Sequence, residues 1–156
     1  MATSPMPRFW VGSLAVALSC VSMIAVGSPA GAATGPDLAP TAITFDPAKV
    51  VANSTVHFDS GVVNTGDAES GVFNIKWLVD NHEVGAYGSH ASVPAGATVL
   101  DGNSQFDYTF PSAGSYIVEF RIDVDGHVAE SNENNNTTSV TVAVPDAAGN
   151  GNAMAR

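Results

Sequence analysis

Apolar and polar residues alternate with a period of two along several short segments of the second half of the chain. In the longest of them, Val118, Phe120 and Ile122 are separated by Glu119 and Arg121. Successive side chains of a β-strand point to opposite faces, so this spacing gives each strand one apolar and one polar face. The same region shows no sustained apolar spacing of an amphipathic helix. Strands with one wet face are typical of antiparallel sheets, and the chain is therefore expected to be all-β.

Turn-forming residues separate the alternating segments at short intervals. They include Asp46-Pro47, Asn64-Thr65-Gly66, Asp80-Asn81-His82 and Pro111-Ser112-Ala113-Gly114. The predicted strands cover residues 38–45, 54–64, 72–80, 83–88, 97–110, 115–125 and 137–144, with a bulge or hairpin at Asp101-Gly102-Asn103. Seven short antiparallel strands in a region of this length predict an immunoglobulin-like β-sandwich.

Individual residues have expected places in such a sandwich. Trp77 should be the core tryptophan of the third strand, and Tyr116 should form a tyrosine corner at the start of the sixth. The first strand, with Pro40, and the fourth, with Gly85 and Gly88, are expected at open edges of the sheets. Proline and glycine at an edge protect it against pairing with another chain.

The first 32 residues differ from the rest. No charged side chain occurs between Phe9 and Pro36, Arg8 precedes this run, and Ala30-Gly31-Ala32 follows its apolar part. This order predicts an apolar signal-peptide helix that is cleaved after Ala32. An uncleaved anchor is one alternative, because the run is almost long enough to span a bilayer, and lipidation of Cys20 is another.

The predicted organisation is a signal peptide (1–32), one folded domain (33–145) and a disordered tail (146–156). We therefore expect a secreted protein that lies outside the cell or in its envelope. The chain has 15 acidic and five basic residues, with a formal charge of −10, so nucleic acid is excluded as a partner, as is a membrane after cleavage. The single cysteine lies in the signal peptide, which leaves the domain without a disulfide or a cysteine-rich zinc site.

Short motifs are spread along the predicted domain. They are Pro36-Asp37-Leu38, Asn64-Thr65-Gly66, Trp77-Leu78-Val79-Asp80 with Val84-Gly85, Pro94-Ala95-Gly96, Pro111 to Tyr116, and Asp123 to Asn136 with the pattern D-x-D…V-x-E-x-N-E-x-N-N. In these motifs the chain resembles bacterial CARDB domains (cell adhesion related domain found in bacteria) from Pro36 to Val144. Asn81 replaces a usual glycine, and the segment from Thr98 to Gln105 is longer than in the family. The resemblance implies a seven-stranded, non-catalytic, immunoglobulin-like module of secreted or surface proteins.

The most family-specific stretch also concentrates oxygen ligands. Asp123, Asp125, Glu130, Asn132 and Glu133 are candidates for a calcium site, because calcium takes six to eight such oxygens. The spacing is not that of an EF-hand loop. The alternative is a structural loop whose Asn and Glu side chains bond its own backbone groups.

No catalytic motif is evident, and an enzyme is not expected. The four histidines are His57, His82, His90 and His127, which are scattered; His57 should lie on a polar face and the other three in or next to exposed turns. A G-x-S-x-G elbow is absent. Asp123 and Asp125 would share one strand face and could act as paired carboxylates, but a single small sandwich seldom has the deep cleft a glycosidase needs.

Together these features predict a secreted, non-enzymatic module that mediates adhesion, or binds an extracellular protein or glycan, at or outside the bacterial envelope. Two alternatives remain open. One is an enzyme or accessory module acting on extracellular polysaccharide. The other is a structural envelope protein stabilised by calcium. No cofactor other than calcium is indicated.

Overall fold

The computed structural model describes residues 34–100 and 104–146. The described residues belong to one compact unit. The predicted signal peptide, the interruption at 101–103 and the tail beyond residue 146 lie outside the described residues. Among the described residues, no helix is both long and apolar enough to cross a membrane.

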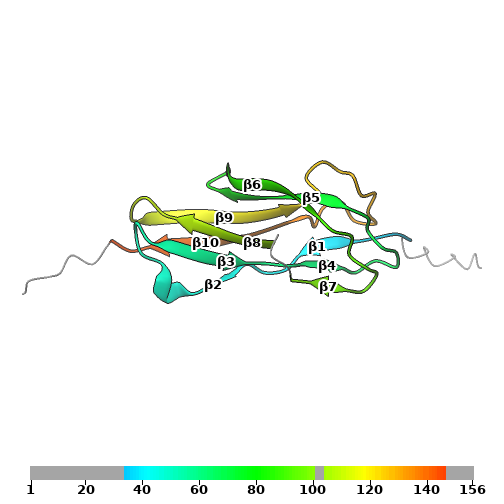
Figure 1. The fold of residues 1–156 in the computed structure, drawn as a ribbon, viewed down its shortest axis with the longest axis horizontal. Coiled ribbons are helices and arrows are strands. Elements are labelled where there is room, and N and C mark those ends of the chain that lie inside the picture. Colours follow the sequence, from blue (N-terminus) through cyan, green and yellow to red (C-terminus); the bar gives the residue numbers. More distant parts are fainter. Residues whose placement is uncertain (1–33, 101–103, 147–156) are drawn as a thin grey trace, which may run out of the picture. The chain divides into compact units, whose positions relative to one another are not determined.

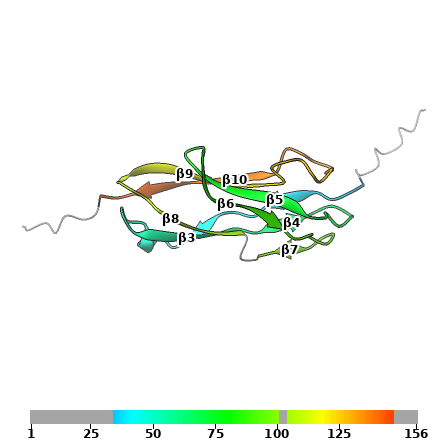
Figure 2. The same cartoon turned by 45° about the horizontal axis from the view of Figure 1, so that its top comes forward.

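The strands form two facing layers, which are seen one above the other in Figure 2. The elements are β1 (Leu38–Pro40), β2 (Thr44–Phe45), the short 3-10 helix η1 (Pro47–Lys49), β3 (Thr55–Asp59), β4 (Val62–Asn64), β5 (Phe73–Val79), β6 (His82–His90), β7 (Thr98–Val99), β8 (Gln105–Thr109), β9 (Gly114–Ile122) and β10 (Thr137–Val144). One layer is the sheet β10-β9-β5-β6, and the other consists of two sheets, β1-β4-β7 and β2-β3-β8 (Figure 1). Every pairing is antiparallel, which confirms the predicted antiparallel β-sandwich.

Three of the predicted strands are each divided in two, all in the same layer. The first is β1 and β2, the second is β3 and β4, and the fifth is β7 and β8. Between β3 and β4, the Ser60 hydroxyl donates to the Thr41 carbonyl at 3.0 Å. The next residue, Gly61, is packed so closely that an added Cβ would lie 2.7 Å from the Val99 carbonyl oxygen. The alternation of apolar residues continues across the break in the second strand, so the pattern did not reveal it, whereas an interruption of the fifth strand at residues 101–103 was predicted.

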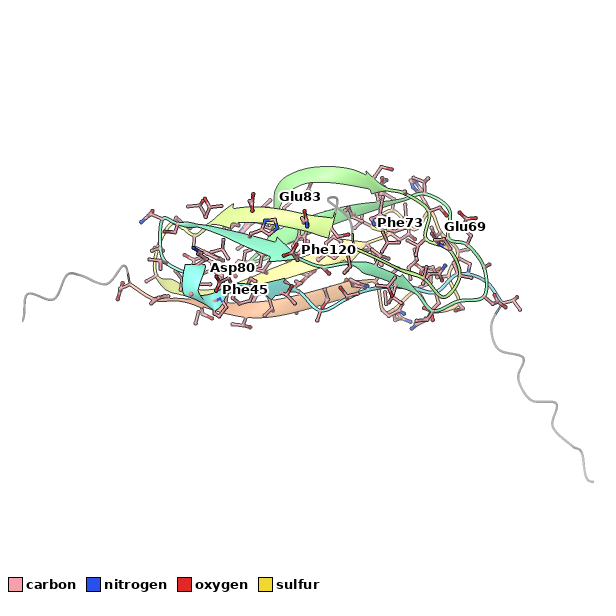
Figure 3. The ribbon with its side chains drawn as sticks, turned by 60° about the horizontal axis from the view of Figure 1, so that its bottom comes forward. Phe45, Glu69, Phe73, Asp80, Glu83 and Phe120 are labelled. Carbon is pink, nitrogen blue, oxygen red and sulfur yellow. The ribbon has the colours of Figure 1, made fainter. Side chains whose placement is uncertain are left out.

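The core between the layers is aromatic. Trp77 is only 4% exposed, and its ring stacks on Phe120 at 4.6 Å and on Phe106 at 5.3 Å between ring centroids. Figure 3 shows Phe73 and Phe120 between the ribbons of the two layers. The prediction of Trp77 as the core tryptophan is confirmed. Its indole Nε1 is buried and has no hydrogen-bond partner among the described residues.

Tyr116 forms the predicted tyrosine corner. Its hydroxyl donates to the Ser112 carbonyl at 3.1 Å and lies 3.0 Å from the Ser112 hydroxyl. The hydrogen bond joins the start of β9 to the turn that precedes it. It thereby fixes the direction in which the chain enters the sheet.

Asn64, at the end of β4, is fully buried and connects three parts of the chain. Its Oδ1 accepts from the backbone N–H groups of Asp37 and Gly66, each at 3.0 Å. Its Nδ2 donates to the carbonyls of Ala68 at 2.8 Å and Val93 at 2.9 Å. The side chain therefore satisfies four backbone groups that no strand ladder could reach.

The expectation that His90 lies in an exposed turn is wrong. It is the last residue of β6, which is longer than the predicted strand, and it is 1% exposed. Its ring stacks on Phe73 with 4.7 Å between centroids, and its Nδ1 lies 2.7 Å from the Ala91 carbonyl oxygen. His57, His82 and His127 are exposed, as expected.

Candidate functional site

The loop between β9 and β10 carries the predicted calcium ligands. It arches at the end of the sandwich where β1 begins, in yellow and orange in Figure 1. Two backbone contacts tie the loop to neighbouring parts: Ser131 N–H donates to the Pro36 carbonyl at 2.9 Å, and Ile122 N–H donates to the Asn136 carbonyl at 2.9 Å. The middle of the loop is thus tied to the segment before β1, and its two ends are joined to each other.

Asp123 is the first residue after β9 and begins the loop. Its φ of 43° lies in the left-handed region, and Gly126, with φ 61°, donates its N–H to the Asp123 carbonyl at 3.0 Å. The Asp123 carboxylate accepts the N–H groups of His127 at 3.0 Å and Val128 at 3.2 Å. The side chain thus stabilises the turn that reverses the chain. It is 5% exposed.

This geometry corrects the prediction that β9 extends to residue 125 with Asp123 and Asp125 on one strand face. β9 ends at Ile122, and Asp125 is exposed in the turn, where its carboxylate accepts from Asn74 Nδ2 at 2.6 Å. The alternation continued through Val124, but the hydrogen bonds of the Asp123 side chain stop the strand before it. The paired-carboxylate arrangement considered for glycoside hydrolysis is therefore not formed by these two residues.

Glu130 connects the loop to β1. Its Oε2 accepts the Leu38 backbone N–H, and its Oε1 accepts from Asn136 Nδ2 at 2.9 Å. Burial raises the pKa of the Glu130 carboxyl; these two hydrogen bonds oppose the shift, and the nearby carboxylates of Asp123 and Glu133 add to it. A positive charge placed beside Glu130 would therefore stabilise its ionised carboxylate.

Three of the five predicted ligands are brought together. Asp123, Glu130 and Glu133 each place a carboxylate oxygen within 4.8 Å of the others. They range from buried through half-buried to exposed, so the cluster reaches from the edge of the core to solvent. Asn132 lies in the same loop, where its Oδ1 accepts the Asn134 N–H at 3.2 Å. We call Asp123, Glu130 and Glu133 the carboxylate cluster.

Two asparagine side chains of the same loop also contribute buried amide oxygens. Asn136 donates its Nδ2 to Glu130, while its Oδ1 is buried and has no hydrogen-bond partner among the described residues. The Oδ1 of Asn135 is also buried and has no hydrogen-bond partner among the described residues. A buried acceptor without a donor costs free energy, and a cation is one species that can satisfy it. The donor set, of carboxylate and amide oxygens, therefore fits a hard divalent cation such as calcium.

A groove of about 280 Å³ opens beside the cluster. Its lining includes Asp123, Glu133 and Asn136, together with Lys76 and Arg121. The two basic residues face each other in register on β5 and β9, and Lys76 Nζ lies 3.6 Å from a carboxylate oxygen of Glu83. Neither residue was predicted from the sequence to belong to a site. Pairing the third with the sixth predicted strand would have placed them at this end of the sheet.

A second polar group lies on the outer face of β3 and β8. His57 Nδ1 is 2.6 Å from an Asp107 oxygen, and Nε2 is 3.3 Å from an Asp59 oxygen. The hydrogen bond to Asp107 raises the pKa of His57 above 6.5; desolvation opposes this, and the carboxylate of Asp59 adds to the rise. The arrangement follows from the antiparallel register, which places His57 opposite Asp107.

We expect Asp107→Asn to lower the pKa of His57, as measured from the ring proton shifts in an NMR titration. Because the folded-state pKa is raised, the contribution of protonated His57 to stability is fully present below the unfolded pKa and is lost as pH rises through the folded pKa. The difference in melting temperature between wild type and His57→Gln should therefore shrink as pH rises through that range. An unchanged His57 pKa in the Asp107→Asn variant would contradict the assignment.

The comparisons with known proteins agree with this architecture. The CARDB family model matches residues 35–140, which is more than half of the chain. The chain belongs to the CARDB family. None of the curated protein sequences compared with it gives a match.

Solved structures show the same fold. A CARDB domain from Pyrococcus furiosus, crystallised in complex with di-metal ions, has a TM-score of 0.62 and 22% identity, and the match covers 72% of this chain and 96% of that domain. A domain of a Methanosarcina acetivorans protein that is named for the cell surface has a TM-score of 0.56 and 28% identity, over 72% of this chain and 94% of that one. The matches thus cover almost the whole length of each of those two solved domains.

Proposed function

We propose that this CARDB protein is a non-enzymatic binding module that works at or outside the bacterial envelope, and that a calcium ion holds its β9–β10 loop. The carboxylate cluster carries the proposal. Three acidic side chains that would repel one another converge within 4.8 Å, and a divalent cation would neutralise them.

The comparisons support both parts of the proposal. Metal ions are present in the structure of the Pyrococcus furiosus domain, and the Methanosarcina acetivorans relative is named as a protein of the cell surface. The expected signal peptide would bring this chain to the same side of the membrane. Calcium is abundant outside the cell, where weak sites with dissociation constants of about 10⁻⁴ to 10⁻³ M are occupied.

Each member of the carboxylate cluster would have a distinct role. Asp123 already accepts the His127 N–H within the loop and Glu130 accepts the Leu38 N–H of β1, so both carboxylates are preorganised before an ion arrives. Glu133 is exposed and would close the site from the solvent side. A bound ion would rigidify the loop and the groove beside it, which offers both acidic and basic groups to an extracellular protein or glycan.

Calcium is expected to raise the melting temperature, and excess EDTA to reverse the rise. With calcium at ten to a hundred times the dissociation constant, linkage predicts a stabilisation of about 1.5 to 3 kcal/mol. Glu133→Gln should abolish most of the rise, because this exposed residue contributes to the site and little to the core. Asp125→Asn is the matched control, from the same loop but outside the cluster, and should keep the full rise. Thermal unfolding followed by circular dichroism measures both.

The binding role is tested separately. The protein should be found outside the cytoplasm in fractionated cells that express the full chain. Immobilised on beads, it should retain material from cell-wall fractions in the presence of calcium and less in EDTA. An absence of any calcium-dependent melting shift would refute the ion site, whereas a purely cytoplasmic location would refute the envelope role.

A further inference from the structure

Strand β10 is an unprotected sheet edge. In the described topology it is hydrogen bonded to β9 alone. Its eight residues, Thr-Thr-Ser-Val-Thr-Val-Ala-Val, contain no charge, no proline and no glycine. The expected edges β1 and β6 are indeed edges, but β1 has three residues and Pro40, and β6 contains Gly85 with a φ of 82°. Natural edges are normally blocked by such devices, and β10 has none of them.

The hydrogen-bond phase shows which backbone groups of β10 face outwards. Ile122 N–H donates to the Asn136 carbonyl, so this pair is a hydrogen-bonded one. In an antiparallel ladder these pairs alternate with non-bonded ones, and the register is unbroken from Thr137 to Val144. Residues 138, 140, 142 and 144 therefore bond to β9. The N–H and C=O groups of residues 137, 139, 141 and 143 point away from the sheet.

The outer face of this strand is exposed, and a groove opens at its C-terminal end. The side chains of Thr137, Ser139, Thr141 and Ala143 are exposed. At the C-terminal end of β10, a groove of about 520 Å³ lies between Val142 and Val144 on one side and Phe45 and Pro47 on the other. The orange strand along the lower margin of Figure 3 is β10, and it lies on the outside of the domain.

We infer that β10 pairs edge to edge with β10 of a second copy of this chain. An antiparallel pair centred on Val140 brings the outward groups of residues 137, 139, 141 and 143 opposite one another, because this set is symmetric about residue 140. Ser139 then faces Thr141 of the partner subunit, and such hydroxyl pairs are favourable across strands. The four-stranded sheets of the two copies become one continuous sheet.

Charge favours a second copy over a charged partner strand. The edge itself is neutral, so it offers no complement to a basic or acidic peptide. The nearest charged side chains in the sheet, Glu119 and Arg121, lie one strand back on β9. In the pair the two β9 strands are three strand spacings apart, about 14 Å. This exceeds the screening length of roughly 8 Å at physiological salt, so the charges on the two β9 strands are largely screened from one another.

The contact is expected to be weak in free solution. One pair of eight-residue edges buries less than the roughly 1,200 Å² typical of stable interfaces. Copies held on one surface reach effective concentrations in the millimolar range, where a weak edge contact becomes populated. Pairing would therefore depend on local density, and it would link copies without involving the carboxylate cluster.

The test uses protein purified from cells that express the full chain. Sedimentation should show monomer at about 10 μM and a growing dimer fraction towards about 1 mM. Amide exchange at Ser139, Thr141 and Ala143 should slow over the same range. Thr141→Lys should remove both effects by charging the edge. Thr55→Lys is the matched control, with the same change at an exposed position of β3, in the other layer.

The melting temperatures of both variants establish that they are folded. Dimerisation that persists in Thr55→Lys and is lost in Thr141→Lys supports the inference. A wild-type protein that stays monomeric near 1 mM overturns it. Slowed exchange that maps to β6 or β8 instead of β10 overturns it as well.

Discussion

Replacing Asn64 by alanine is expected to lower the free energy of unfolding by about 3 to 4 kcal/mol, since four hydrogen bonds are lost and their backbone partners stay inside the protein. The amide accepts from Asp37 and Gly66 and donates to Ala68 and Val93. These groups belong to the residue before β1, to the turn after β4 and to the segment before β7. None of them gains a strand partner when the side chain is removed. Urea unfolding followed by circular dichroism measures the change.

Asn64→Asp tests the reason for that loss. The substitution keeps the shape and the acceptor towards Asp37 and Gly66, but it turns the donor into an oxygen that faces the carbonyls of Ala68 and Val93. The variant should be at least as unstable as Asn64→Ala at neutral pH, because a buried carboxylate lies against two carbonyl oxygens. A variant as stable as wild type would show that the amide donor is not what holds the three segments.

Trp77→Ala is expected to reduce the free energy of unfolding by about 3 to 5 kcal/mol, because it removes the largest side chain of the core and leaves a cavity. The ring is 4% exposed and stacks between Phe106 of β8 and Phe120 of β9. It therefore connects the two layers. Far-ultraviolet circular dichroism is the suitable measurement, because the substitution removes the one tryptophan of the described residues and with it the tryptophan fluorescence signal.

Trp77→Phe separates packing from polarity. The smaller ring keeps most of the stacking, and the change also removes an indole N–H that is buried without a partner. The expected loss is about 1 to 2 kcal/mol, well below that of alanine. A loss equal to that of alanine would indicate that the indole N–H has a partner, such as an ordered water molecule.

The strands were predicted well where the alternation of apolar and polar residues alone determines their ends. β10 covers the expected residues 137–144, and β5 differs from the expected segment by one residue at each end. The errors have specific causes. Alternation continued through Val124, but a side-chain carboxylate ended β9 at Ile122. Alternation also continued across Gly61, where the close approach of Val99 divides the strand.

The candidate site was predicted as a segment but not as a set of residues. All five predicted ligands lie in the β9–β10 loop or at its start. Of the four acidic ones, Asp123, Glu130 and Glu133 converge, whereas Asp125 accepts from Asn74. The position of Glu130 in the cluster depends on Leu38, because the Leu38 N–H donates to the Glu130 carboxylate. The two residues are 92 positions apart in the chain. A local pattern contains no information on such a contact. The same limit applies to His90, whose burial depends on the ring of Phe73.

The short length of β1 has a mechanical consequence. The described chain starts beside β1 at one end of the sandwich and finishes after β10 at the other, so tension between these points would load both strands in shear (Figure 1). β10 resists with eight paired residues and β1 with three. The first strand would therefore yield first, unless Asn64 and Glu130, which grip the Asp37 and Leu38 amides, carry the load. An ion bound at Glu130 would then raise the force at which β1 separates from the sandwich.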